Sequence, residues 1–173
     1  MKINIYTIII FGFVIFFLSI FWLGLERDNN YNTKNLTGKK IASFKLSSIH
    51  NDDLISDEIL RQNEFTLINF FSSWCAPCRL EHKYLIKLAK QNKDIEILGI
   101  NFKDKRNNAL SFLNELSDPY NFVAQDIDGK ASILFGIYGI PESILINKDL
   151  TIIKKIVGPI DQKQFEDILK LIQ

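Results

Sequence analysis

The sequence predicts an α/β domain that follows a single apolar, membrane-spanning helix. Three observations support this fold class: an uncharged apolar run over residues 3–25, alternating strand-like and helix-like segments from residue 41 onward, and one pair of cysteines between two such segments. The chain has 173 residues, 47% of them hydrophobic, and a net charge of +1. This near-neutral charge argues against a nucleic-acid-binding protein, which would carry a clustered basic face.

The apolar run is interrupted only by Asn4, Thr7 and Ser19. About 20 such residues span a bilayer as a helix, whereas a helix in a soluble core would not be apolar on all sides. A small-x-small cleavage site is not evident before Glu26, so we expect residues 1–25 to form an uncleaved transmembrane signal anchor. More lysines and arginines follow the run than precede it, which would keep the domain inside, but this rule is weak with so short a leading segment.

Residues 26–40 are polar and rich in asparagine, which predicts a flexible tether. The globular domain is then expected over residues 41–173. A domain of about 130 residues can form a sufficient core without structural disulfides.

Strand-like and helix-like segments alternate within this domain. From β-branched and aromatic apolar runs, strands are expected at 41–46, 65–71, 95–100, 122–124, 142–146 and 151–157. Helices are expected at 56–60, 76–90, 106–116 and 131–135, with a last helix after Asp161, which forms a capping box with Gln164. Residues 65–100 would thus form a parallel βαβ unit, and residues 142–157 a hairpin.

The only two cysteines, Cys75 and Cys78, lie where the 65–71 strand passes into the 76–90 helix. Cys75 would sit at the start of the helix, where unpaired backbone N–H groups and the helix dipole favour a thiolate, so we predict that it is the nucleophile. Cys78 follows one turn later and is placed to resolve a mixed disulfide formed at Cys75. Pro77 is tolerated between them because the first helical turn needs no N–H there.

The same Cys-x-x-Cys pair is also compatible with half of a zinc site. His50 and His82 would complete a Cys2His2 set, but structural zinc usually uses paired knuckles and this chain has one. His82 falls off the apolar arc of its helix, so we expect a solvated side chain rather than a ligand.

Glu81 is the acidic residue that the helical pattern singles out. It falls in the middle of the apolar arc formed by Tyr84, Leu85 and Leu88. We therefore expect its carboxylate to be buried near the sulfurs, where desolvation raises the pKa and suits the group to exchange a proton with Cys78. The alternative is a surface glutamate that pairs with Arg79 or Lys83.

Three segments resemble the thioredoxin fold and, within it, the DsbE/CcmG thiol:disulfide interchange proteins of cytochrome c maturation: Asn69–His82, Gly99–Asp104 and Gly136–Ser143. Trp-Cys-x-x-Cys marks only the superfamily, whereas Gly-Ile-Tyr-Gly-x-Pro-Glu is the specific signal. The resemblance covers nearly the whole chain and implies a thioredoxin-like fold with an N-terminal extension, preceded by a transmembrane helix. It also implies a cis-proline at Pro141 that faces the cysteines, although an X-Pro bond considered alone would be expected in trans.

The resemblance assigns expected roles to further residues. The buried acid that typical thioredoxins carry at the position of Asn69 would have moved to Glu81. Glu142 would lie at the rim of the substrate groove as part of an acidic active site, with a strand-edge charge that limits aggregation as the alternative. The backbone at Ile140 would pair with an extended substrate. Trp74 would shield the disulfide and contact partners, with plain core packing as the alternative.

The resemblance implies a reductase with no cofactor beyond the redox-active Cys75–Cys78 disulfide, on the periplasmic side of a bacterial inner membrane. Its expected substrate is the Cys-x-x-Cys-His of apocytochrome c, kept reduced for haem attachment, and its expected electron donor is a DsbD/CcdA-type membrane protein. Two alternatives remain open. A general exported oxidant or isomerase would use the same motif, although the DsbA family carries a large helical insertion for which this chain has no room, and the reduction potential separates these cases. A non-catalytic zinc-binding or adaptor domain predicts bound metal and no turnover.

Overall fold

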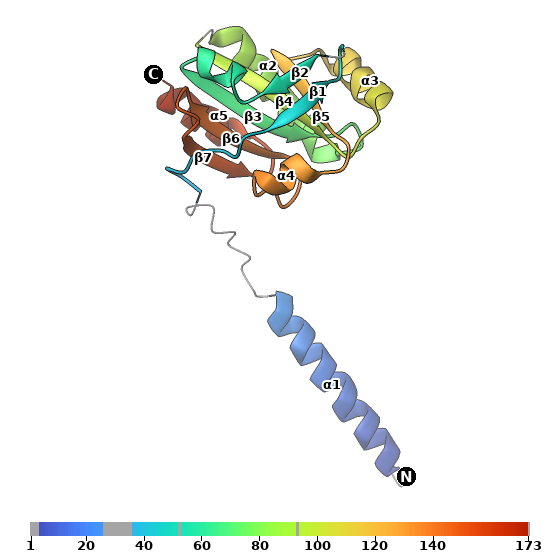
Figure 1. Ribbon diagram of the computed structural model, residues 1–173. Coiled ribbons are helices and arrows are strands. Elements are labelled where there is room, and N and C mark those ends of the chain that lie inside the picture. The colour runs from blue at the N-terminus through green and yellow to red at the C-terminus, as the bar shows by residue number, and fades with distance from the viewer. Residues whose placement is uncertain (1–3, 26–35, 52, 93, 173) are drawn as a thin grey trace. The chain divides into compact units, whose positions relative to one another are not determined.

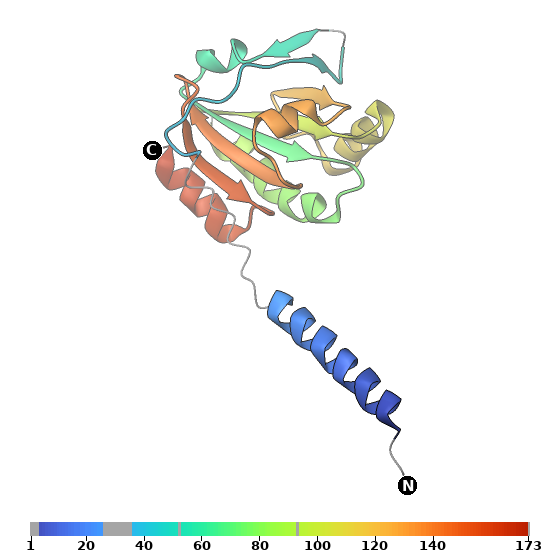
Figure 2. The ribbon, with the colours of Figure 1, turned by 60° about the horizontal axis from the view of Figure 1, so that its bottom comes forward.

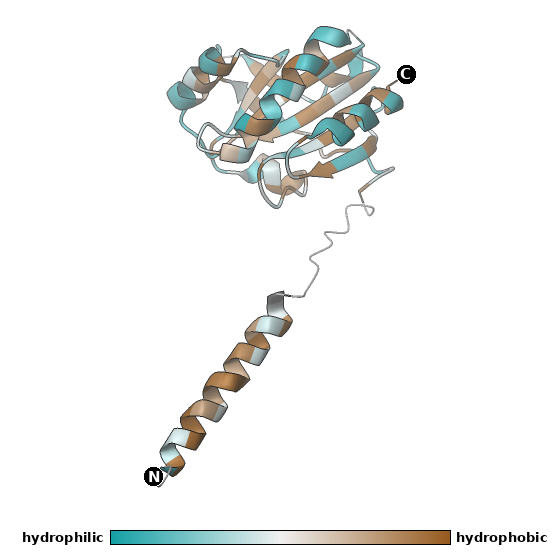
Figure 3. Cartoon of the chain, turned by 180° about the vertical axis from the view of Figure 1, so that it is seen from behind, coloured by the Kyte–Doolittle hydropathy of each residue, from teal (hydrophilic) through white to brown (hydrophobic). Residues whose placement is uncertain are grey.

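The computed structural model of the protein describes residues 4–25, 36–51, 53–92 and 94–172, which fall into two units. The first unit is α1 (Ile5–Leu25), a helix that is mostly brown in Figure 3 because its side chains are apolar on all sides. Its segment Ile5–Gly24 is long and apolar enough to cross a membrane. The expected anchor also includes residues 1–3, which lie outside the described ranges.

The second unit is built on a seven-stranded sheet with the order β2-β1-β5-β4-β3-β6-β7. The strands are β1 (Lys45–Ser48), β2 (Leu54–Ser56), β3 (Phe65–Phe71), β4 (Ile95–Phe102), β5 (Phe122–Asp126), β6 (Glu142–Asn147) and β7 (Ile152–Val157). The three central strands β5, β4 and β3 run parallel, and the outer strands pair antiparallel. Figure 2 shows the β1–β2 hairpin at one edge of the sheet and β7 at the other.

Helices cover both faces of the sheet (Figure 1). They are the 3-10 turn η2 (Ile59–Gln62) and the helices α2 (Ala76–Gln91), α3 (Arg106–Leu116), α4 (Lys130–Leu134) and α5 (Gln162–Leu171). The side chains of β3 alternate between two layers of the core, as the two-residue period of a strand requires. Leu67 and Phe71 pack with α2, α3 and α5, whereas Ile68 and Phe70 pack with η2 and with Phe135, which follows α4. Asn69 therefore points toward the α2 side, which is where the two cysteines lie.

The central strands and the long helices lie where the sequence predicts them, but the N-terminal part of the domain differs. The first strand is Lys45–Ser48 rather than 41–46, and the expected helix at 56–60 is replaced by β2 and η2. Ser56 is not a helix cap, because it ends β2 opposite Lys45. The resulting hairpin joins the sheet through Ser47, which pairs with Gln125 of β5.

The expected tether at 26–40 falls largely outside the described residues, but its last five residues are in contact with the domain. The N–H of Gly38 donates to the carbonyl of Ile152 over 2.8 Å, and Ile152 in turn donates to Lys39 over 2.8 Å. Leu36 packs against the core cluster that contains Ile68 and Phe70. Residues 36–40 of the expected tether are therefore part of the domain.

Candidate active site

The two cysteines form a disulfide at the N-terminus of α2, directly after the loop that follows β3. Cys75 is the N-cap residue of the helix, and its sulfur accepts a hydrogen bond from the N–H of Cys78 over 3.2 Å. The side chains of Ala76 and Pro77 face solvent, whereas Cys75 and Cys78 are 4% and 1% exposed. Because a helix N-terminus favours negative charge, this position stabilises a thiolate at Cys75 once the disulfide is reduced.

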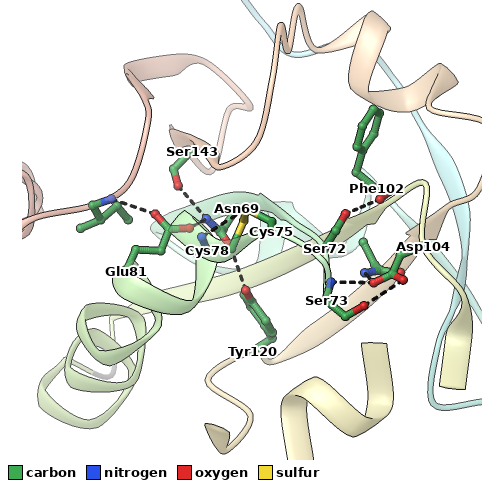
Figure 4. The surroundings of a disulfide bond; sticks show 12 residues. Asn69, Ser72, Ser73, Cys75, Cys78, Glu81, Phe102, Asp104, Tyr120 and Ser143 are labelled. Atoms are coloured by element: carbon green, nitrogen blue, oxygen red, sulfur yellow. Dashed lines mark hydrogen bonds between the residues drawn. A yellow bond between two sulfur atoms is a disulfide. The ribbon is translucent and has the colours of Figure 1, made fainter. Parts of the chain in front are cut away.

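Hydrogen bonds to the end of β4 hold the loop that leads to Cys75. The carboxylate of Asp104 accepts from the N–H of Ser73 over 2.7 Å and from its hydroxyl over 3.0 Å, and Ser72 donates to the carbonyl of Phe102 (Figure 4). Trp74 donates from Nε1 to the carbonyl of Lys103 over 3.3 Å. Its ring is 60% exposed, which rules out plain core packing and leaves an apolar surface beside the disulfide.

Glu81 is buried one turn after Cys78 and is 1% exposed. Its Oε1 accepts from the amide of Asn69 and its Oε2 from the N–H of Ile160, each over 2.8 Å. Burial raises the pKa of Glu81 to about 7, and these two hydrogen bonds only partly oppose the rise. The alternative that Glu81 forms a surface ion pair is wrong, because Glu81 is buried and Arg79 forms a bidentate salt bridge with Glu115 on α3.

Asn69 links Glu81 to two residues that the sequence did not single out, Tyr120 and Ser143. Its amide donates to Glu81 and, over 3.0 Å, to the hydroxyl of Ser143, while its carbonyl accepts from the Tyr120 hydroxyl over 2.8 Å (Figure 4). Burial raises the pKa of Tyr120 well above its usual value, so the hydroxyl keeps its proton and donates. This contact fixes the carbonyl side of the Asn69 amide, so its two N–H groups donate to Glu81 and Ser143.

Pro141 lies at the start of β6, next to Glu142 at the first position of that strand. The Ile140–Pro141 peptide bond is cis, as the resemblance implied. Ile140 packs against the core cluster that contains Cys75 and Cys78. The loop before β6 therefore lies against the layer of the core to which both cysteines belong.

Glu142 does not lie at an exposed rim, and that expectation is wrong. It is 1% exposed, and its Oε2 lies 2.8 Å from the ammonium nitrogen of Lys155 on β7. Its Oε1 accepts from the N–H groups of Tyr138 and Gly139 over 2.9 and 3.0 Å. The strand-edge alternative is equally wrong, because β6 lies between β3 and β7. The side chain turns inward because buried partners for both of its oxygens are available there.

His82 is also buried, contrary to the expected solvated position. Its Nε2 lies 2.7 Å from the carbonyl oxygen of Ser117, and its ring meets Phe112 of α3 edge-on. The buried face of α2 is wider than its apolar residues indicate, because α3 covers the side of the helix on which His82 lies. His50 pairs separately with Asp118. In the described part of the chain, no group of three or more histidine, cysteine or acidic side chains is arranged to hold a metal ion, so the zinc alternative gains no support.

Known proteins match both the sequence and the fold. The Redoxin family profile matches residues 29–172. The thiol:disulfide interchange protein CycY of Rhizobium leguminosarum is 51% identical over 98 residues, which are 57% of this chain and 52% of that protein. DsbE of Pseudomonas aeruginosa is 39% identical over 134 residues, which are 78% of this chain and 73% of that protein. A Chlorobium tepidum structure provisionally assigned as DsbE has a TM-score of 0.70, with 79% of this chain and 98% of that chain covered, at 22% identity.

A helix-capping disulfide beside a buried acid, in a sheet of this topology, defines a thiol:disulfide oxidoreductase. The chain belongs to the Redoxin family and, within it, to the DsbE/CcmG group of thiol:disulfide interchange proteins.

Proposed function

We propose that the protein is a membrane-anchored reductase that keeps the Cys-x-x-Cys-His cysteines of apocytochrome c reduced for haem attachment, on the periplasmic side of a bacterial inner membrane. The observation that carries this proposal is the Cys75 sulfur at the α2 N-terminus with the buried Glu81 one turn beyond Cys78. The likeness to DsbE and CycY supports the proposal. The apolar helix α1 would supply the anchor.

In the proposed reaction, the Cys75 thiolate attacks one sulfur of the substrate disulfide, and the other substrate sulfur leaves as a thiolate that takes up a proton from water. Cys78 then gives its thiol proton to the Glu81 carboxylate and attacks the sulfur of Cys75. The second substrate thiol is released, and the Cys75–Cys78 disulfide remains. Two electrons have passed from the protein to the substrate.

The environment of Glu81 supports its part in this exchange. A carboxylate whose pKa is about 7 is a stronger base than an ordinary glutamate, yet it is still partly ionised at neutral pH. The N–H donors of Asn69 and Ile160 keep the ionised form available inside the core. We expect Glu81 to pass its proton on when the disulfide is reduced again.

The disulfide form must regain two electrons before the next turnover. We propose that a DsbD/CcdA-type membrane protein supplies them through its own dithiol, which becomes a disulfide. Trp74 and the loop before Pro141 would contact both this donor and the substrate, since both must reach the same sulfur. We expect no further cofactor.

Trapping the substrate tests the proposal. Cys78→Ser removes the resolving thiol, so the mixed disulfide at Cys75 should persist and can be isolated and identified by mass spectrometry. A Cys75→Ser/Cys78→Ser chain is the control and should trap nothing. A trap that contains no c-type apocytochrome would contradict the proposed substrate, and bound metal without any trap would favour a non-catalytic domain.

A further inference from the structure

Two charged side chains hold the loop between α4 and Pro141 at both of its ends. The ammonium group of Lys155 donates to the carbonyl of Gly136 over 2.5 Å and lies 5.1 Å from the centre of the Tyr138 ring. It also lies 2.8 Å from Oε2 of Glu142, whose other oxygen accepts from the N–H groups of Tyr138 and Gly139. One buried ion pair thus contacts the loop backbone at three of its residues.

This ion pair lies inside the protein rather than on its surface. The side chains of Lys155 and Glu142 are 0% and 2% exposed. Burying two charges is unfavourable unless each charge is paired and its remaining hydrogen-bonding capacity is used. Here the loop uses that capacity: its carbonyl at residue 136 needs a donor, and its N–H groups at 138 and 139 need an acceptor. Lys155 supplies the donor and Glu142 supplies the acceptor.

The loop held by this ion pair ends at the core cluster that contains the disulfide. Its last residue before the proline, Ile140, packs against the cluster that contains Cys75 and Cys78. Tyr138, two residues earlier, is 74% exposed and presents an aromatic surface. The position of both side chains relative to the sulfurs therefore depends on how the backbone from 136 to 140 is held.

We propose that Lys155 is a positioning residue for partner binding: together with Glu142 it fixes the loop at 136–140, which presents Tyr138 and Ile140 to the polypeptide that carries the substrate disulfide. The inference deepens the proposed function and rests on it for the identity of that polypeptide. Lys155 has no part in the sulfur chemistry. A small disulfide, which needs only the sulfur of Cys75, should therefore react at the same rate whether or not the loop is fastened.

Substitution of Lys155 by methionine tests the inference in the full-length chain in detergent micelles. The matched control is Lys154→Met, the neighbouring lysine of β7, which pairs instead with Asp167 on α5. Two reactions of the reduced protein are compared: with a synthetic peptide that contains a Cys-x-x-Cys-His disulfide, and with oxidised glutathione. Hydrogen exchange measured by mass spectrometry reports on residues 136–140 directly.

We expect Lys155→Met to raise KM for the peptide about tenfold and to speed exchange in the loop by about the same factor, since it leaves a buried carboxylate without its counter-charge. The rate with glutathione should stay within about twofold of wild type, because Cys75 is unaffected. The double variant Lys155→Met/Glu142→Gln should recover much of both effects, because the glutamine carbonyl can still accept from Tyr138 and Gly139 and no unpaired charge remains. Lys154→Met should change neither.

Unchanged exchange and unchanged KM in Lys155→Met would overturn the inference, and so would an equal loss of rate with the peptide and with glutathione. If Lys155→Met does not fold, the double variant Lys155→Met/Glu142→Gln tests the inference instead. It still lacks the hydrogen bond to Gly136, so hydrogen exchange at residues 136–140 must be faster than in wild type. A wild-type protein that reduces glutathione but not the peptide would contradict the proposed substrate. Hydrogen exchange at 136–140 would still decide the role of Lys155.

Discussion

Substituting Glu81 by glutamine tests whether the buried carboxyl beside Cys78 titrates near neutral pH. Burial raises the pKa of Glu81 from 4.5 to about 7 in the folded protein, whereas an unfolded chain keeps the lower value. Between these two values the folded state holds a proton that the unfolded state has released. The contribution of Glu81 to the free energy of unfolding is therefore largest below pH 4.5 and falls as the pH rises toward 7.

The size of this effect follows from the difference between the two pKa values. At about 1.4 kcal/mol for each tenfold change in proton affinity, the difference corresponds to about 3 kcal/mol in all, most of which falls between pH 5 and pH 8. Glu81→Gln removes the titrating group, so the variant should not show this decrease in unfolding free energy with rising pH. At pH 5 the variant should be less stable than wild type, because its amide N–H group meets the N–H of Asn69 or of Ile160 instead of an acceptor.

The assay is urea unfolding of the full-length chain with the disulfide intact, in detergent micelles, at a series of pH values from 5 to 8. Glu115→Gln on α3 is the matched control: the hydrogen bonds from Arg79 lower the pKa of this exposed carboxyl, so it is ionised in both states throughout this range. The difference in unfolding free energy between Glu81→Gln and wild type should change with pH, and that of the control should not. The same pH dependence in all three proteins would show that Glu81 is ionised in the folded state and would refute the reasoning.

Three further outcomes are expected. In the reduced protein, Glu81→Gln should raise the pH at which Cys78 is alkylated, because the neighbouring base is lost, and an unchanged profile would exclude the proton-transfer role. Burial lowers the pKa of His82, so its contribution to the stability of wild type should fall as the pH drops below 6.5, where an unfolded histidine gains a proton. In thermal unfolding, His82→Gln should therefore lose less stability than wild type between pH 7.5 and pH 5.5. Trp74→Ala should slow reduction of a Cys-x-x-Cys-His peptide while changing Tm far less than the buried Phe112→Ala, and equal losses of Tm would indicate a packing role.

The elements that carry the cysteines could be predicted because their apolar patterns are long and unambiguous. The seven-residue strand β3 is buried along almost its whole length, and α2 presents Glu81 among leucines at helical spacing. The β1–β2 hairpin could not be predicted in the same way. Its first strand, Lys45–Ser48, has a single aliphatic residue and gains its place from pairing with β5, more than 70 residues further along the chain.

The surroundings of the site depend on contacts that no local pattern contains. Lys155 follows Lys154 in the sequence, and two adjacent lysines in a hairpin strand give no sign that one of them is buried. Only the pairing of β6 with β7 brings Lys155 to Glu142. Tyr120 lies in the loop before β5 and reaches Asn69 across the parallel strands. The family resemblance supplied the position of Pro141 and drew attention to Asn69, but it gave neither the burial of Glu142 nor the partner that makes this burial possible.

Glu81 and Glu142 are both buried, and their different neighbours suit them to different roles. Glu81 meets only uncharged donors, the amide of Asn69 and the N–H of Ile160, so nothing with a full positive charge opposes the effect of burial on its pKa. Glu142 meets the ammonium group of Lys155, and its second oxygen is occupied by loop N–H groups. A group that exchanges protons with Cys78 must be able to change its charge without disturbing the fold, and the uncharged donors around Glu81 allow this. The oxygens of Glu142 are instead engaged by a lysine and by the loop backbone. We therefore assign the proton exchange with Cys78 to Glu81, and the positioning of the loop at 136–140 to Glu142. A shift in the pH dependence of Cys78 alkylation caused by Glu142→Gln but not by Glu81→Gln would reverse that assignment.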